Sequence, residues 1–398
     1  MKKILIVDDE VQILKALSRM FLETDYEIFT AENGMEALKL IEASEIDMVI
    51  SDMRMPILDG YQLLSIVKEK YPKIIRIILS GYAEEKPMFR ALLHNVAKLY
   101  VFKPWNNTEL LDNINKLFTD DIVLNSEDLV NSIKAFDCDC EMPENCKDLV
   151  KLIEEENMDA LVSQLEAETV ISSLLIQVGK SAVYGVMPNT VKQAAHYIGL
   201  HNLKSFIHWA CVISNTKQSD DISDQPELLW QHAYLTNRIF LFLYETFFHK
   251  QPPEATMFAG LMHNIGLIVL SKNLQSNGTL RKGALTVDDY AKLDLEEYEF
   301  NHQEIGGYLL DMWDIPFPMY EVAIYHHRPT SPSIVNNELV SCVHIAQHYA
   351  WVCLGASVSE AVADEVFHNI NINIEDFEKR LSRYLKCEHE FIRSKIPV

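Results

Sequence analysis

The sequence lacks several features that would mark whole classes of protein. It has no run of about 18 apolar residues, so we expect no membrane-spanning helix and no membrane partner. The amino terminus MKKILIVDDE enters a strand pattern without the apolar region of a signal peptide, which predicts a cytoplasmic protein. It has no basic run either, and its formal net charge is −23. Because such a chain repels polyanions, nucleic acid is not an expected partner.

Cysteine is scarce and irregularly spaced. The seven cysteines form an odd set, which does not predict a disulfide framework. Cys138, Cys140 and Cys146 cluster in FDCDCEMPENC and could hold a soft metal or act as a redox pair. A fourth strong ligand is missing nearby, so we interpret this stretch as a reduced, acidic segment between two domains.

The spacing of apolar residues divides the chain into two parts with different hydrophobic patterns. In residues 1–118, amphipathic segments alternate with five runs rich in Ile and Val: KKILIVDD, YEIFTA, MVISD, IRIILS and KLYVFK. This alternation predicts an α/β domain with a five-stranded, doubly wound parallel sheet of the flavodoxin-like kind. In residues 147–398, apolar residues recur every three or four positions, which predicts an all-helical domain. Residues 119–146 are the expected connector.

Polar side chains follow four of the predicted strands. Asp8 and Asp9 come directly after ILIV, and Asp52 comes after MVIS. Because the carboxyl ends of parallel strands share one edge of a sheet, three carboxylates would meet there, and such a cluster usually holds a hard cation such as Mg²⁺. Ser80 ends the fourth strand, and Lys103 follows the fifth, where its charge could meet a phosphoryl group.

These residues together resemble the receiver domain of two-component response regulators in their order, spacing and placement. The segments that carry the resemblance are Asp8-Asp9, SDMRMPILDG, Ser80-Gly81 and Lys103-Pro104. The resemblance implies that Asp52 is the phosphoacceptor. It also implies that Asp8, Asp9, Asp52 and the Arg54 carbonyl form the Mg²⁺ site.

The same resemblance assigns further roles. It implies that Lys103 and Ser80 contact the phosphoryl oxygens and that Tyr100 is the aromatic residue that responds to them. A sensor histidine kinase or a phosphotransfer protein would supply the phosphoryl group. The helix after Ser80, the strand KLYVF and the helix NNTELLDNINKLF are the surface expected to change.

Five histidines lie in the helical patterns of the second part: His232, His263, His302, His326 and His327. Metal-dependent phosphohydrolases of the HD type combine such imidazoles with two carboxylates, which offset the cation charge and hold the attacking water. The sequence around these histidines resembles HDOD, the HD-related output domain. The resembling segments are ISSLLIQVGKSAVYG, LWQHAYLTN, FAGLMHNIGLIVL, EYEFNHQEIGGYLLDMWDIP and AIYHHRP.

The second part departs from the catalytic pattern at both carboxylates. Asn264 stands where an Asp is expected beside His263, and Gln347 stands where the distal Asp is expected. An amide oxygen carries no charge and is a poor ligand for a catalytic transition metal. The segment HHRPTSPSI also lacks the GYP signature of the related cyclic di-GMP phosphodiesterases.

The chain is therefore expected to be a phosphorylation-controlled regulator whose HDOD domain is not an enzyme and signals through protein contact. The output protein is not identified by the sequence, and a homodimer is the favoured response to phosphorylation. We expect no metal at the histidines, although imidazoles alone can hold Zn²⁺ or Fe²⁺. The alternative is an HD-type phosphohydrolase acting on cyclic di-GMP. A DNA-binding regulator is a third interpretation, but the chain lacks a basic recognition helix.

Overall fold

The computed structural model describes residues 1–81, 90–124, 144–181, 188–216, 225–276, 286–295, 301–357 and 362–393. The chain divides into two compact units. The first comprises Met1–Ser126 with Asp314–Phe317, and the second comprises Glu127–Trp313 with Pro318–Val398. Each unit is described by itself below.

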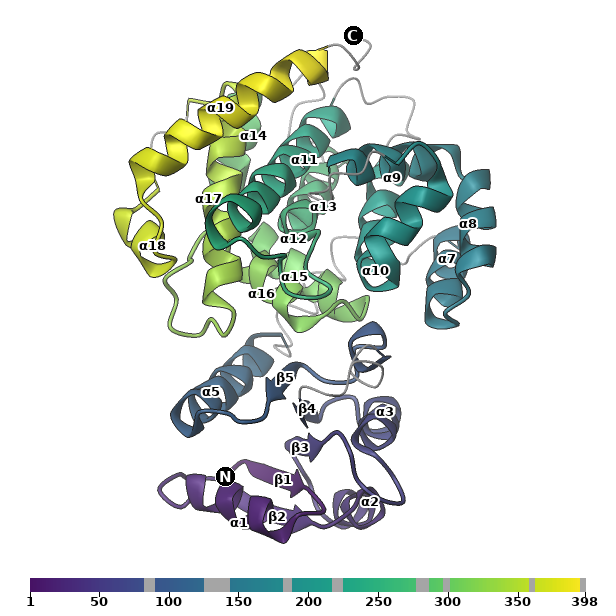
Figure 1. Cartoon of the computed structure of the whole chain (residues 1–398), viewed down its shortest axis with the longest axis vertical. Coiled ribbons are helices and arrows are strands. Elements are labelled where there is room, and N and C mark those ends of the chain that lie inside the picture. The colour runs from purple at the N-terminus through teal and green to yellow at the C-terminus, as the bar shows by residue number, and fades with distance from the viewer. Residues whose placement is uncertain are drawn as a thin grey trace. The chain divides into compact units, whose positions relative to one another are not determined.

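The first unit contains a parallel sheet of five strands, as predicted, in the order β2-β1-β3-β4-β5 (Figure 1). The strands are β1 (Lys3–Val7), β2 (Glu27–Ala31), β3 (Met48–Asp52), β4 (Ile75–Ser80) and β5 (Leu99–Phe102). The register pairs Val7 with Ser51 and Ser80 with Phe102. The residues that follow β1, β3, β4 and β5 therefore gather at one edge of the sheet, where such folds bind their ligands.

Helices pack against this sheet, and they explain why its central strands β1 and β3 are fully or largely buried. The helices are α1 (Val11–Met20), α2 (Gly34–Ala43), α3 (Gly60–Lys70) and α5 (Asn107–Leu124). Ile4 through Val7 of β1 are fully buried, as expected for a strand covered on both faces. Asp59 begins α3 by accepting a hydrogen bond from the Gln62 N–H at 2.8 Å, within a capping box. Helix α5 continues beyond residue 118 to Leu124.

The described residues of the second unit contain helices and no β-strand. The helices are α7 (Glu144–Glu154), α8 (Met158–Ala167), α9 (Thr169–Ser181), α10 (Val191–Thr216), α11 (Gln225–Leu243), the π-helical turn η1 (Tyr244–Phe248), α12 (Ala259–Met262), α13 (Ile265–Ser276), α14 (Val287–Leu295), α15 (His302–Met312), α16 (Phe317–Tyr325), α17 (Asn337–Leu354), α18 (Asp364–Asn369) and α19 (Ile374–Arg393). This confirms the predicted helical half. Within the described ranges, no helix is both long and apolar enough to cross a membrane.

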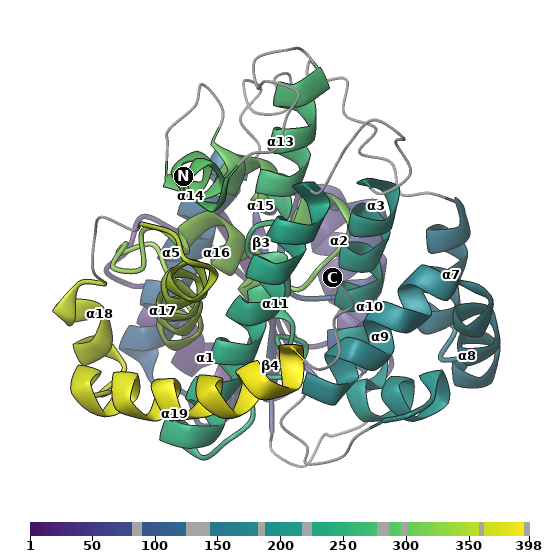
Figure 2. The ribbon, with the colours of Figure 1, turned by 90° about the horizontal axis from the view of Figure 1, so that it is seen from above.

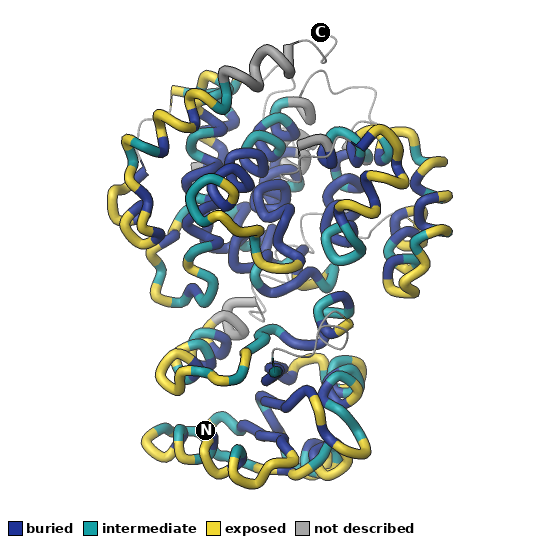
Figure 3. Tube along the Cα trace, viewed as in Figure 1, coloured by how far each residue is buried: buried dark blue, intermediate teal, exposed yellow. Residues whose placement is uncertain are grey.

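Helix α11 lies at the centre of this unit, where it packs along α17 and against α12 (Figure 2). Helices α7 to α10 pack together on one side of α11, and α18 packs on α17 at the other side. Helix α12, most of α13 up to Ser271, and much of α11 and α17 are buried (Figure 3). A polar side chain on the buried faces of these elements is removed from water and needs a partner inside the unit.

One cysteine corrects the interpretation of the cysteine cluster. Cys146 is buried in α7 and forms a disulfide with Cys211 of α10. It is therefore neither reduced nor part of a connector. The two cysteines are 65 positions apart, and only the packing of α7 on α10 brings them together. Cys138 and Cys140 lie outside the described residues, so the prediction for them is untested.

Candidate functional sites

The first site lies at the carboxyl edge of the sheet, where the structure brings three predicted residues together. Asp8 follows β1, Asp52 ends β3, and Lys103 follows β5. The Lys103 ammonium donates a hydrogen bond to Asp8 Oδ2 at 3.1 Å and forms a close ion pair with Asp52. The two carboxylates are only 1% and 7% exposed. The two carboxylates and the Lys103 ammonium thus share a pocket that is largely shielded from solvent.

Burial and charge act in opposite directions on this pair. Burial raises the pKa of the Asp52 carboxyl above its ordinary value, although Lys103 opposes this change. The Arg54 backbone N–H also donates to Asp52 Oδ2, at 2.7 Å. Burial disfavours the charge on Lys103, but Asp52 and Asp8 outweigh it and raise the pKa of the ammonium. Lys103 is therefore a permanent positive charge beside the Asp52 oxygens.

The other predicted residues of this site lie around the pair. Asp9 is exposed next to Asp8, and Ser80 is fully buried at the end of β4. The Tyr100 hydroxyl donates to the Ala91 carbonyl at 2.7 Å, and burial raises its pKa. The roles of these side chains and of the Arg54 carbonyl remain predictions. Residues 82–89, where the predicted switch helix would begin, lie outside the described residues.

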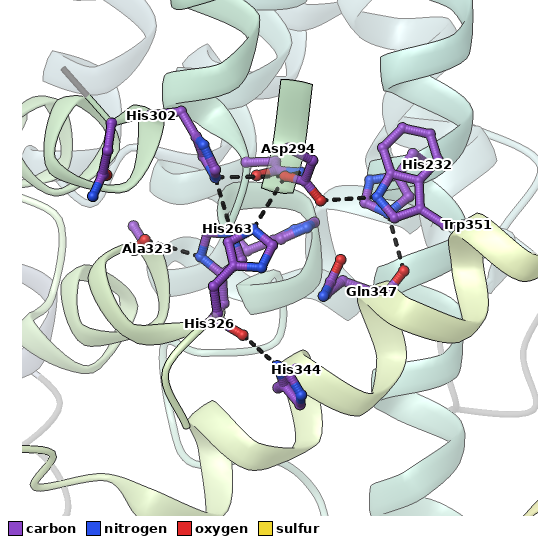
Figure 4. A network of polar contacts seen from close by, with 12 residues as sticks. His232, His263, Asp294, His302, Ala323, His326, His344, Gln347 and Trp351 are labelled. Carbon is purple, nitrogen blue, oxygen red and sulfur yellow. Dashed lines mark hydrogen bonds and ion pairs between the residues drawn. The ribbon is translucent and has the colours of Figure 1, made fainter. Parts of the chain in front are cut away.

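The second site is a cluster of imidazoles in the helical unit (Figure 4). His232 lies on α11, His263 ends α12, His302 begins α15, and His326 and His327 follow α16. Ring centroids are separated by 5.1 Å between His263 and His326, by 5.3 Å between His302 and His326, and by 4.2 Å between His326 and His327. The five histidines singled out by the sequence therefore form one cluster.

A carboxylate that sequence reasoning missed lies inside this cluster. Asp294 of α14 is 2% exposed. Its Oδ1 accepts a hydrogen bond from Asn264 Nδ2 at 2.9 Å and lies 3.3 Å from His327 Nε2. Its Oδ2 accepts from Trp351 Nε1 at 2.9 Å. Asp294 was detectable as a single acid on the apolar face of an amphipathic segment, since Tyr290 on the same face is also buried.

Both predicted amide positions are also part of the cluster. Asn264 contacts Asp294 through its amide nitrogen, whereas the Gln347 backbone carbonyl accepts from His232 Nε2 at 3.1 Å. The Trp351 ring stacks on His232 with centroids 3.8 Å apart. Several buried atoms have no hydrogen-bond partner among the described residues: His232 Nδ1, His263 Nε2, Asn264 Oδ1 and Gln347 Oε1. These atoms make the cluster rich in acceptors that the protein itself does not satisfy.

Burial keeps most of these imidazoles neutral. It lowers the pKa of His232 and of His302 to about 4. It lowers the pKa values of His263 and His326 further, well below the ordinary value. Burial would by itself disfavour ionisation of Asp294, but the nearby imidazoles, His327 first, hold its pKa well below the usual range. The cluster thus combines an ionised carboxylate with the neutral rings of His232, His263, His302 and His326.

Comparison with known proteins agrees with the domain predicted for each half of the chain. A family model described as the response regulator receiver domain matches residues 4–115, and one described as the HDOD domain matches residues 140–329. Sporulation initiation phosphotransferase F of Bacillus subtilis (strain 168) is 33% identical over 115 residues, which are 29% of this chain and 92% of that protein.

Two other similarities are confined to the first part of the chain. The hydrogenase transcriptional regulatory protein HoxA of Bradyrhizobium diazoefficiens is 35% identical over 111 residues, which are 28% of this chain and 23% of HoxA. This chain therefore spans about a quarter of the length of that regulator. A solved receiver domain of an HD domain-containing protein from Pseudomonas fluorescens Pf-5 is 31% identical, with 30% of this chain and 96% of that chain covered and a TM-score of 0.30.

Proposed function

The chain belongs to the response regulator family and joins a receiver domain to an HDOD domain, and we propose that Asp52 is its phosphoacceptor. The observation that carries this proposal is the contact of Lys103 with both Asp8 and Asp52 at the carboxyl edge of the sheet. The donor would be a sensor histidine kinase or a phosphotransfer protein. A positive charge beside a nucleophilic carboxylate is the arrangement that phosphoryl transfer requires.

In the proposed reaction, an Asp52 oxygen attacks the phosphorus of a phosphohistidine. The new O–P bond forms as the P–N bond breaks, and the imidazole nitrogen of the donor takes up a proton. Lys103 would neutralise phosphoryl oxygens, and the Ser80 hydroxyl would donate to one of them. Receiver domains generally bind Mg²⁺ at this place, and the carboxylates of Asp8, Asp9 and Asp52 fit its preference for oxygen ligands. The ion would offset charge on the transferred group.

We further propose that the HDOD domain acts by protein contact and does not catalyse hydrolysis. Asn264 and Gln347 offer no charge to a catalytic metal, and Asn264 directs its amide nitrogen to Asp294. Asp294 Oδ2 is also engaged by Trp351. A catalytic centre would need a metal-bound water that loses its proton near neutral pH, and this needs an open coordination position. The buried cluster is poorly suited to that role.

The wild-type chain is therefore expected to show no turnover of cyclic di-GMP or of a generic phosphodiester with Mn²⁺ or Fe²⁺. The measurement is chromatographic detection of products at high enzyme concentration, with a catalytically active HD-type phosphodiesterase as the positive control. His263→Ala serves as the matched variant, because its imidazole lies inside the cluster. Turnover in the wild type that disappears in His263→Ala would establish a hydrolase and refute the non-catalytic proposal.

Phosphorylation is expected to change a surface of the protein, and dimerisation is the favoured readout. A phosphoryl group adds about two negative charges at Asp52, and it can shift an equilibrium only through contacts that differ between two states. We expect the mass measured by light scattering to double when a phosphoryl mimic such as beryllofluoride is bound. Asp52→Asn should remain at the unliganded mass. If the wild-type mass and its hydrogen-exchange protection both stay unchanged, the proposed surface switch is wrong.

A further inference from the structure

Four ligand atoms in the HDOD domain converge from different helices. One oxygen of Asp294 and one ring nitrogen each of His302, His326 and His327 all lie within 4.8 Å of one another. Asp294 Oδ1 is 3.3 Å from His327 Nε2 and 3.5 Å from His302 Nε2, and the Nε2 atoms of His302 and His326 are 3.2 Å apart. Four ligands at zinc-like bond lengths in a tetrahedron are separated by about 3.4 Å. Three of the six separations lie close to that value, and the other three are within 4.8 Å.

The hydrogen bonds of His326 leave its Nε2 atom available to bind a metal. The Nδ1–H of His326 donates to the Ala323 carbonyl at 2.9 Å, so its Nε2 carries a lone pair directed towards His302. The His344 Nδ1–H donates to the His326 carbonyl at 2.6 Å, which fixes the backbone from the other side (Figure 4). Backbone acceptors that fix the tautomer and orientation of a ring are the usual surroundings of a metal-ligating histidine.

The charge of the cluster favours the binding of a cation. Asp294 is buried, and the contacts described for it come from an amide, an indole and imidazoles, with no Lys or Arg among them. A buried carboxylate is costly unless a positive charge compensates it. The unpartnered acceptor atoms of His263, Asn264 and Gln347 around it show the same excess of lone pairs.

We propose that Asp294, His302, His326 and His327 bind a divalent transition metal such as Zn²⁺ as a structural ion of the HDOD domain. Asp294 comes from α14 and occupies neither of the two positions at which this chain has amides, so its ligand set differs from the motif pattern. Imidazole and carboxylate ligands suit zinc better than magnesium or calcium. Three of these ligands are buried and His327 is partly exposed, and four protein ligands fill a tetrahedral coordination sphere, which is typical of structural sites.

The test is a titration of the full-length, chelator-stripped protein with Co²⁺ and Zn²⁺ in excess Mg²⁺, which occupies the oxygen site of the receiver. Co²⁺ should give the intense visible bands of tetrahedral coordination at one equivalent, and Zn²⁺ should displace them. Asp294→Asn, which keeps the side-chain shape, should weaken binding at least about 100-fold, since even outer residues of metal sites contribute 10- to 100-fold. The partly exposed His327→Gln should weaken it similarly without a change in the deepest packing.

His208→Gln is the matched control, because His208 is a buried histidine whose described ring contact is to Trp313 and not to the cluster. It should bind Co²⁺ like the wild type. The inference is overturned if the wild type gives no tetrahedral bands, or if Asp294→Asn and His327→Gln both bind as tightly as the wild type. Metal binding accompanied by phosphodiester hydrolysis would refute the non-catalytic function and leave the metal site standing.

Discussion

Asp52→Asn is expected to abolish phosphorylation of the chain by a small phosphodonor such as acetyl phosphate in the presence of Mg²⁺. The substitution removes the carboxylate whose Oδ1 pairs with the Lys103 ammonium and whose Oδ2 accepts from the Arg54 N–H. An amide is a far weaker nucleophile than a carboxylate, and it lacks the negative charge that attracts the cation. The measurement is the mass shift of the intact protein, or the mobility of the acyl phosphate form on a phosphate-affinity gel.

Asp59→Asn is the matched control for this experiment. Asp59 lies seven residues away at the start of α3, and Asn preserves its capping hydrogen bond to Gln62. Phosphorylation of this variant should equal that of the wild type. A phosphorylated Asp52→Asn protein would place the acceptor elsewhere and would leave the pocket without its proposed chemistry. The melting temperature of each variant shows whether a lost signal reflects a lost fold.

The receiver half could be read from the sequence because its evidence is local. The strands contain short apolar runs, and Asp8, Ser80 and Lys103 stand at or next to the ends of such runs, as does Asp52. Parallel pairing then places Asp8, Asp52 and Lys103 at one edge without any further information. The sequence pattern did not predict the direction in which the pKa of Asp52 is shifted, because burial and the Lys103 charge act on it in opposite directions.

The helical half could be read only in part, since its site is assembled from distant helices. The five histidines were found from their segments, but nothing adjacent to Asp294 in the sequence connects it to them. Its role depends on the packing of α14 beside α17, which places Trp351 within hydrogen-bond distance, and on Asn264, which reaches it from between α12 and α13. The Cys146–Cys211 disulfide was missed for the same reason. The periodicity of apolar residues predicts which face of a helix is buried. It does not identify the residues of another helix that pack against that face.

Gly266→Ala is expected to cause the largest loss of stability in the HDOD domain. Gly266 lies in α13, two positions after Asn264, where α13 packs against α15. A Cβ atom there would lie 1.9 Å from the His302 carbonyl oxygen and 2.6 Å from the Gly306 nitrogen. Both are backbone atoms, so no side-chain rotation relieves the overlap and the helices must separate. We expect destabilisation of about 3 kcal/mol or more, at the upper end for overpacked cores.

Gly306→Ala is the matched comparison at the same crossing. Its Cβ would meet Gly266 N at 3.3 Å and the Ala323 Cβ at 3.5 Å, which a small adjustment accommodates. Ala is also favoured over Gly in a helix by about 1 kcal/mol, so this variant should melt close to the wild type. Because the overlap in Gly266→Ala displaces the start of α15, it should also disturb His302 and weaken Co²⁺ binding, whereas Gly306→Ala should retain it. Equal melting temperatures for the two variants would show that α13 and α15 do not meet through backbone contact at Gly266.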